Sequence, residues 1–447
     1  MSASIRHRLA RVVWGEFLQT LQDVRKAPQE LAVRAAPTSG PTHSQITLDV
    51  YDELRTIEMP WREFERSADC TVFQSFAWLS AWQRHIGVRA GVVPAITVGM
   101  RADGQLLFLL PLAVVPGLIR RLTWLGSDLC DYNAPLLAPD FQAHVTRDHF
   151  RQIWDEICRL LQSKPMHRYD IVELTKMPES IGSQSNPMTG LGVGLNPSAA
   201  YATELGPSWD EFYRAKRSSA TRKKDRTKRK RLEEIGEVGF VSPGDPDERR
   251  NTLDVLFRQK AKSLARMGVA DIFARPGHRD FLTELALDSA TRHLVHVSRL
   301  DVGSVPAAVN FGLIFRGCFY HVIASYDDGE VARWGPGAAL LRELLAQAIA
   351  IGCRQFDFTI GDEHYKLEWS DRTIKLYDYV AHGRLRGWPL AKVALATSAL
   401  KRRIKGNPKL WSVASRLRAA LSSSRKGPAE ARLPSNPTIK SPPTSPQ

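Results

Sequence analysis

The spacing of apolar and polar positions changes along the chain and predicts alternating helices and strands. In residues 4–26, apolar side chains recur every three to four positions, as in an amphipathic helix. Residues 35–45 are rich in Pro, Gly and Ser and indicate a linker. Beyond them we expect a helix over 75–86, strands over 92–98, 106–115 and 122–125, a helix over 141–162, a strand over 170–174 and a loop over 177–200.

The segment 206–382 has a clearer order. Ser208 followed by Glu211 is typical of a helix start and predicts one helix running through a basic stretch to Leu232. After it we expect a strand at 238–241, helices at 246–266 and 278–291, strands at 293–301, 305–315 and 318–326, a helix opening at Gly337, and strands at 355–359 and 374–381. Much of this order repeats that of the first half. The sequence therefore predicts an α+β protein of two similarly built halves.

Four segments follow from these patterns. They are 1–45, an amphipathic helix and linker; 46–205, the N-terminal half; 206–382, the C-terminal half; and 383–447, a basic helical segment with a Pro/Ser-rich tail. The tail has few large apolar residues, which is typical of disorder.

The net charge of +15 is concentrated in two places. Residues 214–231 hold 11 basic residues and one acid, and residues 383–447 hold 14 and one. The rest of the chain has 37 basic residues against 45 acidic ones, so the body is mildly acidic. Two local segments can attract a nucleic acid, an anionic membrane surface or an anionic small molecule. The basic stretch has no interleaved aromatic side chains, which argues against stacking on single-stranded nucleic acid.

The five cysteines are scattered and none has metal-ligand spacing, so we expect neither a disulfide framework nor a metal site. A reducing, cytoplasmic location fits this usage best. The longest apolar run covers residues 106–119 and contains two prolines, which is too short for a membrane-spanning helix. The helix over 4–26 is expected to pack on the body, with attachment to the inner face of an anionic membrane as the alternative.

The best-motivated site is the turn Trp334-Gly335-Pro336-Gly337 before a predicted helix. A helix start offers free N–H groups and the positive end of the helix dipole. Glycines let an anionic ligand approach the backbone, so this arrangement suits the pyrophosphate of a nucleotide-like co-substrate. The same pattern also serves as a plain turn.

At this point the sequence resembles the CelD/BioF-like branch of the GNAT acyl-CoA N-acyltransferases, which are related to the FemAB-like transferases. The resemblance covers about residues 70–382. It is carried by Phe73-Gln74-Ser75 with Trp78 and Trp82, Gly126, Asp131 to Leu136, Arg231-Leu232-Glu233 with Gly236, Ala307 to Asn310, Tyr320, Ser325-Tyr326-Asp327, Gly335-Pro336-Gly337, Asp357-Phe358 with Gly361, and Tyr365-Lys366.

The resemblance implies two tandem GNAT-like halves, each a mixed, largely antiparallel sheet flanked by helices, with a non-catalytic first half. It implies that Gly335, Gly337 and Ala338 bind acyl-CoA as co-substrate. The residues from Asn133 to Pro139, before the long helix of the first half, include no glycine, in agreement with this. The general GNAT loop reads Gln/Arg-x-x-Gly-x-Gly/Ala. Here its first position is Trp334, and Pro336 removes one N–H donor.

GNAT-like chemistry needs a base for the attacking amine and a proton for the leaving thiolate. The catalytic candidates are Asp357, Tyr365 and Tyr326, which all lie in the motif cluster. A hydrogen-bonded structural role is the alternative for Asp357.

The candidate substrate-binding residues are Asn310, Lys366 and His364. Lys366 suits a carboxylate or phosphate of the substrate, or lies in solvent. Asn310 either orients the substrate or forms structural hydrogen bonds within the sheet. His321 and His296 are expected to be core histidines.

The sequence thus favours an N-acyltransferase that moves an acyl group from acyl-CoA to an amine, in exopolysaccharide or cell-envelope biosynthesis. One alternative is FemAB-like aminoacyl transfer from charged tRNA. Another is a non-catalytic scaffold of a membrane polysaccharide-synthesis complex.

Overall fold

The computed structural model describes residues 46–405. The predicted amphipathic helix over 4–26, the linker over 35–45 and the part of the basic tail after residue 405 lie outside the described residues. Within 46–405, none of the helices has the length and apolar character needed to cross a membrane.

The first sheet is built around two long apolar strands, β2 (Val93–Met100) and β3 (Leu106–Val115), which pair antiparallel. Almost every residue of β3 is buried, because the continuous apolar run lets both strand faces pack. The sheet order is β1-β2-β3-β4-β6-β17-β9, with β5 beside β3. The remaining strands are β1 (Thr47–Tyr51), β4 (Arg121–Trp124), β5 (Leu136–Leu137), β6 (Ile171–Pro178), β9 (Gly194–Leu195) and β17 (Leu376–His382).

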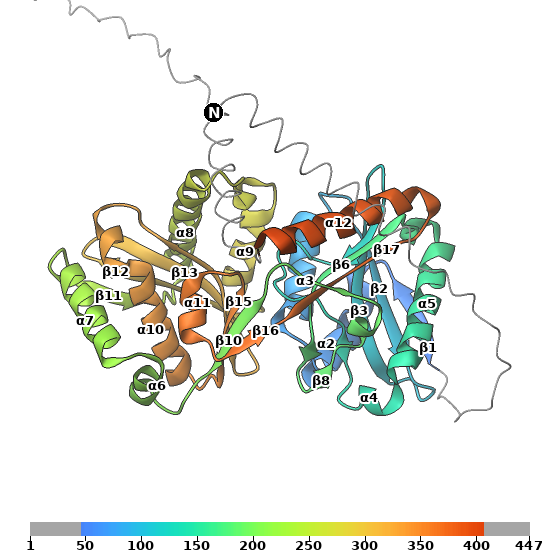
Figure 1. Ribbon diagram of the computed structural model, residues 1–447, viewed down its shortest axis with the longest axis horizontal. Helices are drawn as coiled ribbons and strands as arrows, with labels where there is room; N and C mark the ends of the chain where they lie inside the picture. Colours follow the sequence, from blue (N-terminus) through green and yellow to red (C-terminus); the bar gives the residue numbers. More distant parts are fainter. Residues whose placement is uncertain (1–45, 406–447) are drawn as a thin grey trace, which may run out of the picture. The chain divides into compact units, whose positions relative to one another are not determined.

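The second sheet has the order β11-β12-β13-β14-β15-β10-β16. Its centre is a meander of β12 (Val295–Val302), β13 (Val305–Phe315) and β14 (Cys318–Tyr326), as the sequence predicts. The other strands are β10 (Ala200–Glu204), β11 (Val238–Val241), β15 (Gln355–Ile360) and β16 (Arg372–Ile374). The expected α+β class, with two sheets flanked by helices, is confirmed (Figure 1).

Helices cover both sheets. In the first half these are α2 (Leu54–Ser67), α3 (Phe76–Trp82), α4 (Phe141–His144) and α5 (Arg147–Ser163), and α12 (Trp388–Lys405) lies along β17 and β6. In the second half they are α6 (Trp209–Lys216), α7 (Ser219–Glu233), α8 (Pro246–Arg266), α9 (His278–Leu287), α10 (Pro336–Ala350) and α11 (His364–Trp369). Helices α8 and α10 pack against the same strands, β13 and β14, and cover opposite faces of them (Figure 1).

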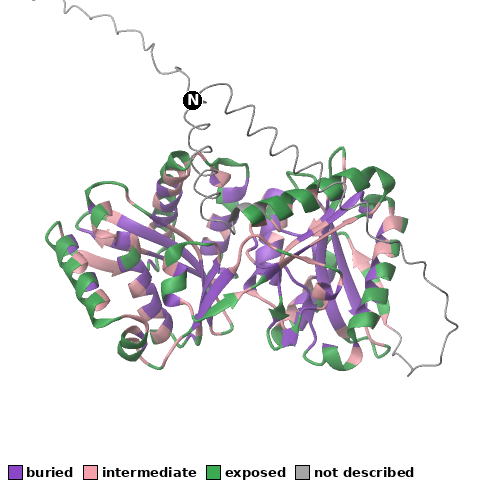
Figure 2. Ribbon diagram, viewed as in Figure 1, coloured by how far each residue is buried: buried purple, intermediate pink, exposed green. Residues whose placement is uncertain are grey.

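Two apolar clusters stabilise the described residues. One runs from the first sheet, through α2 and α3, to α8, α9 and one face of the second sheet. The other packs α10 against the opposite face of the second sheet. Figure 2 shows the strands of both sheets buried and much of α7 and α12 exposed. Contacts between halves include the rings of Trp78 and Phe281, whose centroids are 4.8 Å apart.

The sheets differ from the expected segments 46–205 and 206–382 in one respect, because they exchange strands. Strand β10 precedes residue 206, yet it lies between β15 and β16 of the second sheet. Strand β17 precedes residue 383, yet it pairs with β6 of the first sheet. Asp378 on β17 accepts hydrogen bonds from the backbone N–H of Lys176 and the side chain of Asn196, and these bonds hold the strand there.

The single helix predicted from Ser208 to Leu232 is two helices, α6 and α7. Ser218 has extended backbone geometry, and its side chain accepts a hydrogen bond from the N–H of Thr221. A serine in this position starts a new helix, because it satisfies one of the free N–H groups of the first turn. The break sets the basic helix α7 apart from α6.

We expect Phe281→Ala to lower the free energy of unfolding by about 3–5 kcal/mol, because it removes a fully buried ring from the shared cluster. Since Trp78 of the first half packs on this ring, urea unfolding followed by tryptophan fluorescence and by far-UV circular dichroism should show one shifted transition. A first half that unfolds at its original midpoint would contradict a shared core.

Candidate active site

The candidate site forms where two parallel strands separate. Strands β14 and β15 pair only from Cys318 to Tyr320 on one side and Gln355 to Asp357 on the other. Beyond this, β15 bends, since Thr359 has a φ of 59°, an unusual value for a β-branched residue. The pairing of β14 with β13 shifts by one residue next to His321, and that of β15 with β10 shifts next to Thr359. These irregularities end the parallel pairing directly before His321.

The glycine turn follows β14 and starts α10. Gly335 is the N-cap residue with a φ of 70°, a left-handed conformation that glycine adopts without steric cost. The N–H groups of Ala338 and Ala339 both bond to the carbonyl of Gly335, while the N–H of Gly337 makes no backbone hydrogen bond within the described residues 46–405. Gly337 therefore leaves one donor free at the positive end of a 15-residue helix.

Helix α7 places a cation beside this turn. The Nζ of Lys228 lies 3.6 Å from where a Cβ of Gly335 would stand, so the absence of a side chain lets the ammonium group approach the backbone. The guanidinium of Arg231 lies over the ring of Trp334, 5.8 Å from its centroid. A free N–H, a left-handed glycine and a lysine fit a phosphate group, although Pro336 supplies one donor fewer than the general loop.

Asp357 is buried and its carboxylate is fully engaged. The hydroxyl of Tyr132, from the first half, donates to both carboxylate oxygens at 2.8 and 3.0 Å. The N–H of Thr359 donates to Oδ1 at 2.7 Å. Burial raises the pKa of Asp357 to about 6, although both hydrogen bonds act to lower it. Asp357 thus ties the first half to the end of the parallel pairing.

Residues of the first-half motif hold Tyr132 in place. The side chain of Gln74 donates to the carbonyl of Tyr132 at 2.8 Å. The ring of Phe73 lies edge-on to Tyr132 and also to Tyr320 of β14, with both centroid distances 5.9 Å. The short motif Phe73-Gln74-Ser75 therefore positions a first-half side chain against the second-half site.

Asn310 and His321 form a buried pair on neighbouring strands. Asn310 Nδ2 donates to the carbonyl of His296 at 3.4 Å, and its Oδ1 lies 2.9 Å from His321 Nδ1. A backbone carbonyl only accepts, so the amide nitrogen faces His296 and the amide oxygen faces His321. Nδ1 of His321 consequently carries the proton, and Nε2 keeps its lone pair.

Charged side chains gather around this pair. Burial lowers the pKa of His321 to about 3, and repulsion by Lys366 and Lys260 adds to the effect. Burial lowers the pKa of Lys260 as well, while Glu363 acts to raise it. Asp131, from the first half, interacts with Lys366 and Thr359, and burial raises the pKa of its carboxyl group. Neutral imidazole is therefore the resting form of His321.

The structure separates the predicted site residues. Asn310 and Lys366 lie near His321. However, Lys366 Nζ donates a hydrogen bond to the carbonyl of Ile360 at 2.8 Å and forms an ion pair with Glu363 at 3.1 Å. Tyr326 is half-exposed and packs against Gly337 at the turn. Tyr365 packs with the α10-side cluster, and burial raises its pKa. His364 is exposed and lies 3.6 Å from Glu368.

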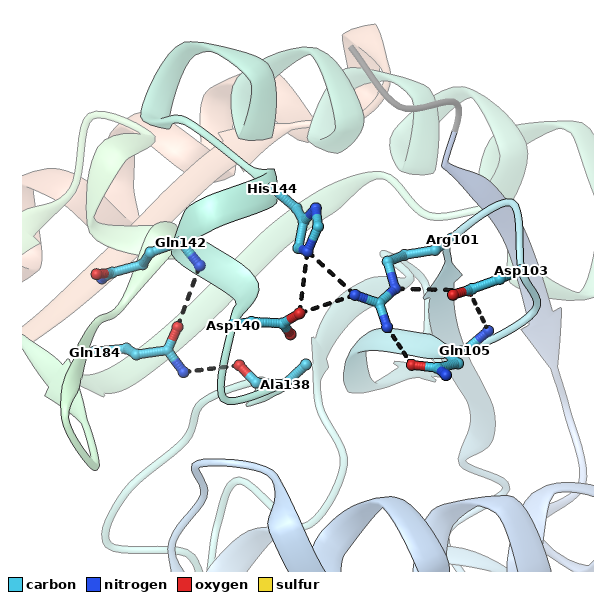
Figure 3. Close-up of polar contacts among 8 residues, drawn as sticks. All are labelled: Arg101, Asp103, Gln105, Ala138, Asp140, Gln142, His144 and Gln184. Carbon is cyan, nitrogen blue, oxygen red and sulfur yellow. Dashed lines mark hydrogen bonds and ion pairs between the residues drawn. The ribbon is translucent and has the colours of Figure 1, made fainter.

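A cluster of polar side chains surrounds the start of α4 in the first half. At the start of α4, Asp140 accepts a hydrogen bond from Arg101 at 2.8 Å and lies 3.0 Å from His144 (Figure 3). Gln184 joins this region by bonding to the carbonyl of Ala138 and the N–H of Gln142. An acidic helix start with a committed carboxylate is a poor site for a phosphate.

Sequence reasoning missed three contributors to the second-half site. Lys228 was one cation among many in a basic run. Tyr132 belonged to a motif of the other half. His321 is buried, as predicted for a core histidine, and the pairing register adds that it follows directly after the last paired residue of β14. In the sequence, an isolated histidine between apolar residues looks the same whether it is a core residue or lies beside a functional site.

Comparisons with known proteins agree with this arrangement. Residues 219–367 match the family model described as an acetyltransferase (GNAT) domain. The second half of the chain thus carries a GNAT acetyltransferase domain, and the protein is an acyltransferase. No curated protein matches the chain.

Three similar solved structures align with this chain over most of their own length. A conserved protein of unknown function from Bacteroides thetaiotaomicron is 13% identical with a TM-score of 0.48, and covers 75% of this chain and 99% of its own. FemX is 10% identical with a TM-score of 0.43, covering 75% and 97%. A tandem GNAT protein from the clavulanic acid biosynthesis pathway is 11% identical with a TM-score of 0.43, covering 76% and 99%.

We expect Tyr132→Phe to destabilise the protein by about 1–3 kcal/mol at pH 8, because it leaves a buried carboxylate with one donor fewer. The pKa of Asp357 lies near 6 in the folded protein, above its ordinary value of 3.8. The folded state therefore holds this proton more tightly, and stability falls as the pH rises from 3.8 through 6. The loss caused by the substitution should accordingly be smaller at pH 5.

Urea unfolding at both pH values measures this effect. The matched control is Asp357→Asn, alone and combined with Tyr132→Phe, since a neutral amide should lose less when the phenol is removed. An equal loss at pH 5 and pH 8 in the aspartate protein would contradict the assigned ionisation.

Proposed function

We propose that the protein is an N-acyltransferase that moves an acyl group from acyl-CoA to an amine by direct attack. The observation that carries the proposal is the Gly335–Gly337 turn, where a free helix N–H and Lys228 meet at the end of a strand whose parallel pairing has opened. In this proposal the phosphates of the donor bind at the turn. Its thioester lies between β14 and β15.

The predicted residues take different parts in this proposal. Gly335, Gly337 and Ala338 form the phosphate-binding turn. Tyr326 lies against that turn with an exposed ring and is suited to protonate the leaving thiolate.

The other predicted residues act around the gap between the strands. Asp357 anchors Tyr132 at the point where the strands separate. Lys366 and Tyr365 fix α11 beside the site, and His364 is exposed where an acceptor can approach.

We assign the chain to the CelD/BioF-like branch of GNAT proteins, acting on an amino sugar or another amine in exopolysaccharide or cell-envelope biosynthesis. The motifs from Phe73 to Tyr132 support this assignment, because Gln74 bonds to Tyr132 and the Tyr132 hydroxyl donates to Asp357 of the second half. The first half then supports the site without binding a donor, in line with the committed carboxylate of Asp140 at the start of α4. The basic segments would hold the protein near an anionic membrane at its cytoplasmic face.

We expect acetyl-CoA to bind in isothermal titration calorimetry and Lys228→Gln to weaken this binding about tenfold, because one charge-assisted contact to a phosphate is lost. The effect should shrink at high salt. Lys223→Gln is the matched control, since Lys223 is an exposed lysine on the same helix. No binding of acetyl-CoA or longer acyl-CoAs to the folded wild-type protein would contradict the proposal.

FemAB-like transfer from charged tRNA is the alternative that the exposed cations of α7 favour. It predicts tRNA binding whose affinity falls steeply with salt and drops when residues 222–230 are neutralised. Under the acyl-CoA proposal, tRNA should bind weakly or not at all in fluorescence anisotropy at physiological salt, and neutralising these residues should change only acyl-CoA affinity. Tight, salt-dependent tRNA binding without acyl-CoA binding would favour the alternative.

A further inference from the structure

His321 occupies a distinctive place in the second sheet. It is the first residue of β14 after the last one paired with β15, so its backbone stands at the point where the strands separate. The hydroxyl of Thr359 donates to its carbonyl at 3.3 Å and bridges the two strands there. The side chain is buried, with 7% of the residue exposed.

The pair with Asn310 fixes the chemical state of this imidazole. The proton sits on Nδ1, since Asn310 offers an oxygen there. Nε2 is not among the fully enclosed polar atoms, and it makes no hydrogen bond within residues 46–405. The result is an unprotonated ring nitrogen without a hydrogen-bond partner within residues 46–405, on the residue that directly follows the paired part of β14.

Three other titratable groups near the opening have polar partners, and a fourth, Lys260, has a charged neighbour but no hydrogen bond. Both oxygens of Asp357 accept hydrogen bonds from Tyr132. Lys366 is bonded to the end of β15 and to Glu363. Asp131 faces the ammonium groups of Lys176 and Lys366. Lys260 faces Lys366 and Glu363 and makes no hydrogen bond or ion pair within residues 46–405.

We infer that His321 Nε2 accepts the proton of the attacking amine, and that Asn310 is the residue that positions it. This inference rests on the proposed acyl-CoA-dependent function. The amine lone pair forms a C–N bond to the thioester carbon while the carbonyl π pair moves to oxygen. The nitrogen then gives its proton to Nε2, the oxyanion re-forms the carbonyl, and the C–S bond breaks. The thiolate takes a proton from the Tyr326 hydroxyl, and the imidazolium returns its proton to the Tyr326 phenolate through solvent, so a thiol and an amide are the products.

The two lysines explain how a weakly basic imidazole suits this step. Burial, together with repulsion by Lys366 and Lys260, lowers the pKa of His321 and keeps it neutral, so it is ready to accept a proton at physiological pH. The nitrogen becomes far more acidic once its bond to carbon has formed, and a weak base then suffices. An acceptor with an anionic group beside its amine would offset Lys260 and strengthen the base.

The test uses bromoacetyl-CoA with the full-length protein. A nucleophile beside the acyl group displaces bromide, forming one bond to the CH₂ carbon and releasing bromide ion. We expect peptide mass spectrometry to find one alkyl group on His321, acetyl-CoA to block it and His321→Gln to abolish it. His296→Gln is the matched control, because His296 is a buried histidine on the neighbouring strand.

Transfer from acetyl-CoA to glucosamine, followed by thiol release, supplies the kinetic readout. His321→Gln should lower kcat about 10²–10⁴-fold and leave the affinity for acetyl-CoA unchanged. Asn310→Asp should move the acidic limb of the pH profile to higher pH, because a carboxylate raises the pKa of the imidazole, whereas a purely structural role would change only stability.

The outcomes distinguish the two proposals. Labelling of Lys260 or Asp131 instead of His321, or no labelling of a protein that binds acetyl-CoA, would overturn the role of His321 and leave the proposed function standing. Absence of any acyl-CoA binding by the wild-type protein would overturn both.

Discussion

The early end of the parallel pairing between β14 and β15 is the constraint on which the site depends. Three residues pair on each strand, and then the left-handed backbone of Thr359 turns β15 away. A strained residue of this kind persists only where its surroundings hold it. Here the N–H of Thr359 is bonded to Asp357, and the hydroxyl is bonded across to His321. The strain and the opening are therefore parts of one arrangement.

The first half acts on this arrangement through Tyr132, which donates to Asp357, and through Asp131, which interacts with Thr359 and Lys366. The Tyr132 hydroxyl donates a hydrogen bond to Asp357 near the rings of Phe73 and Tyr320, which belong to different halves. Gln74 bonds to the backbone carbonyl of Tyr132. A buried carboxylate needs such donors, because an unpaired charge in the interior is costly. Side chains of the first half thus contact the point where the strands of the second half separate.

The apolar pattern was sufficient to predict most elements and their order. β3, β11 and α8 have the predicted bounds, because their apolar runs and caps are strong. The strand exchange of β10 and β17 was not predictable, since a strand pattern does not reveal which sheet it joins. The break at Ser218 was missed because a serine within a basic run resembles any exposed helix position.

The glycine turn of the candidate site was recognisable from the sequence, whereas the contacts around it were not. Glycines before a helix indicate a phosphate site from local sequence alone. The roles of Lys228, Tyr132 and His321 depend on long-range contacts, which spacing along the chain does not encode. Asp357 and Lys366 were named from the motif, and both form buried hydrogen bonds in the structure, to Tyr132 and to the carbonyl of Ile360.

A crystal structure of the protein with acetyl-CoA tests the central claim most directly. The account predicts that the pyrophosphate contacts the N–H of Gly337 and the ammonium of Lys228, with the thioester carbonyl between β14 and β15 near His321. Acetyl-CoA bound at the first half, or bound with its thioester away from the separated strands, would contradict it.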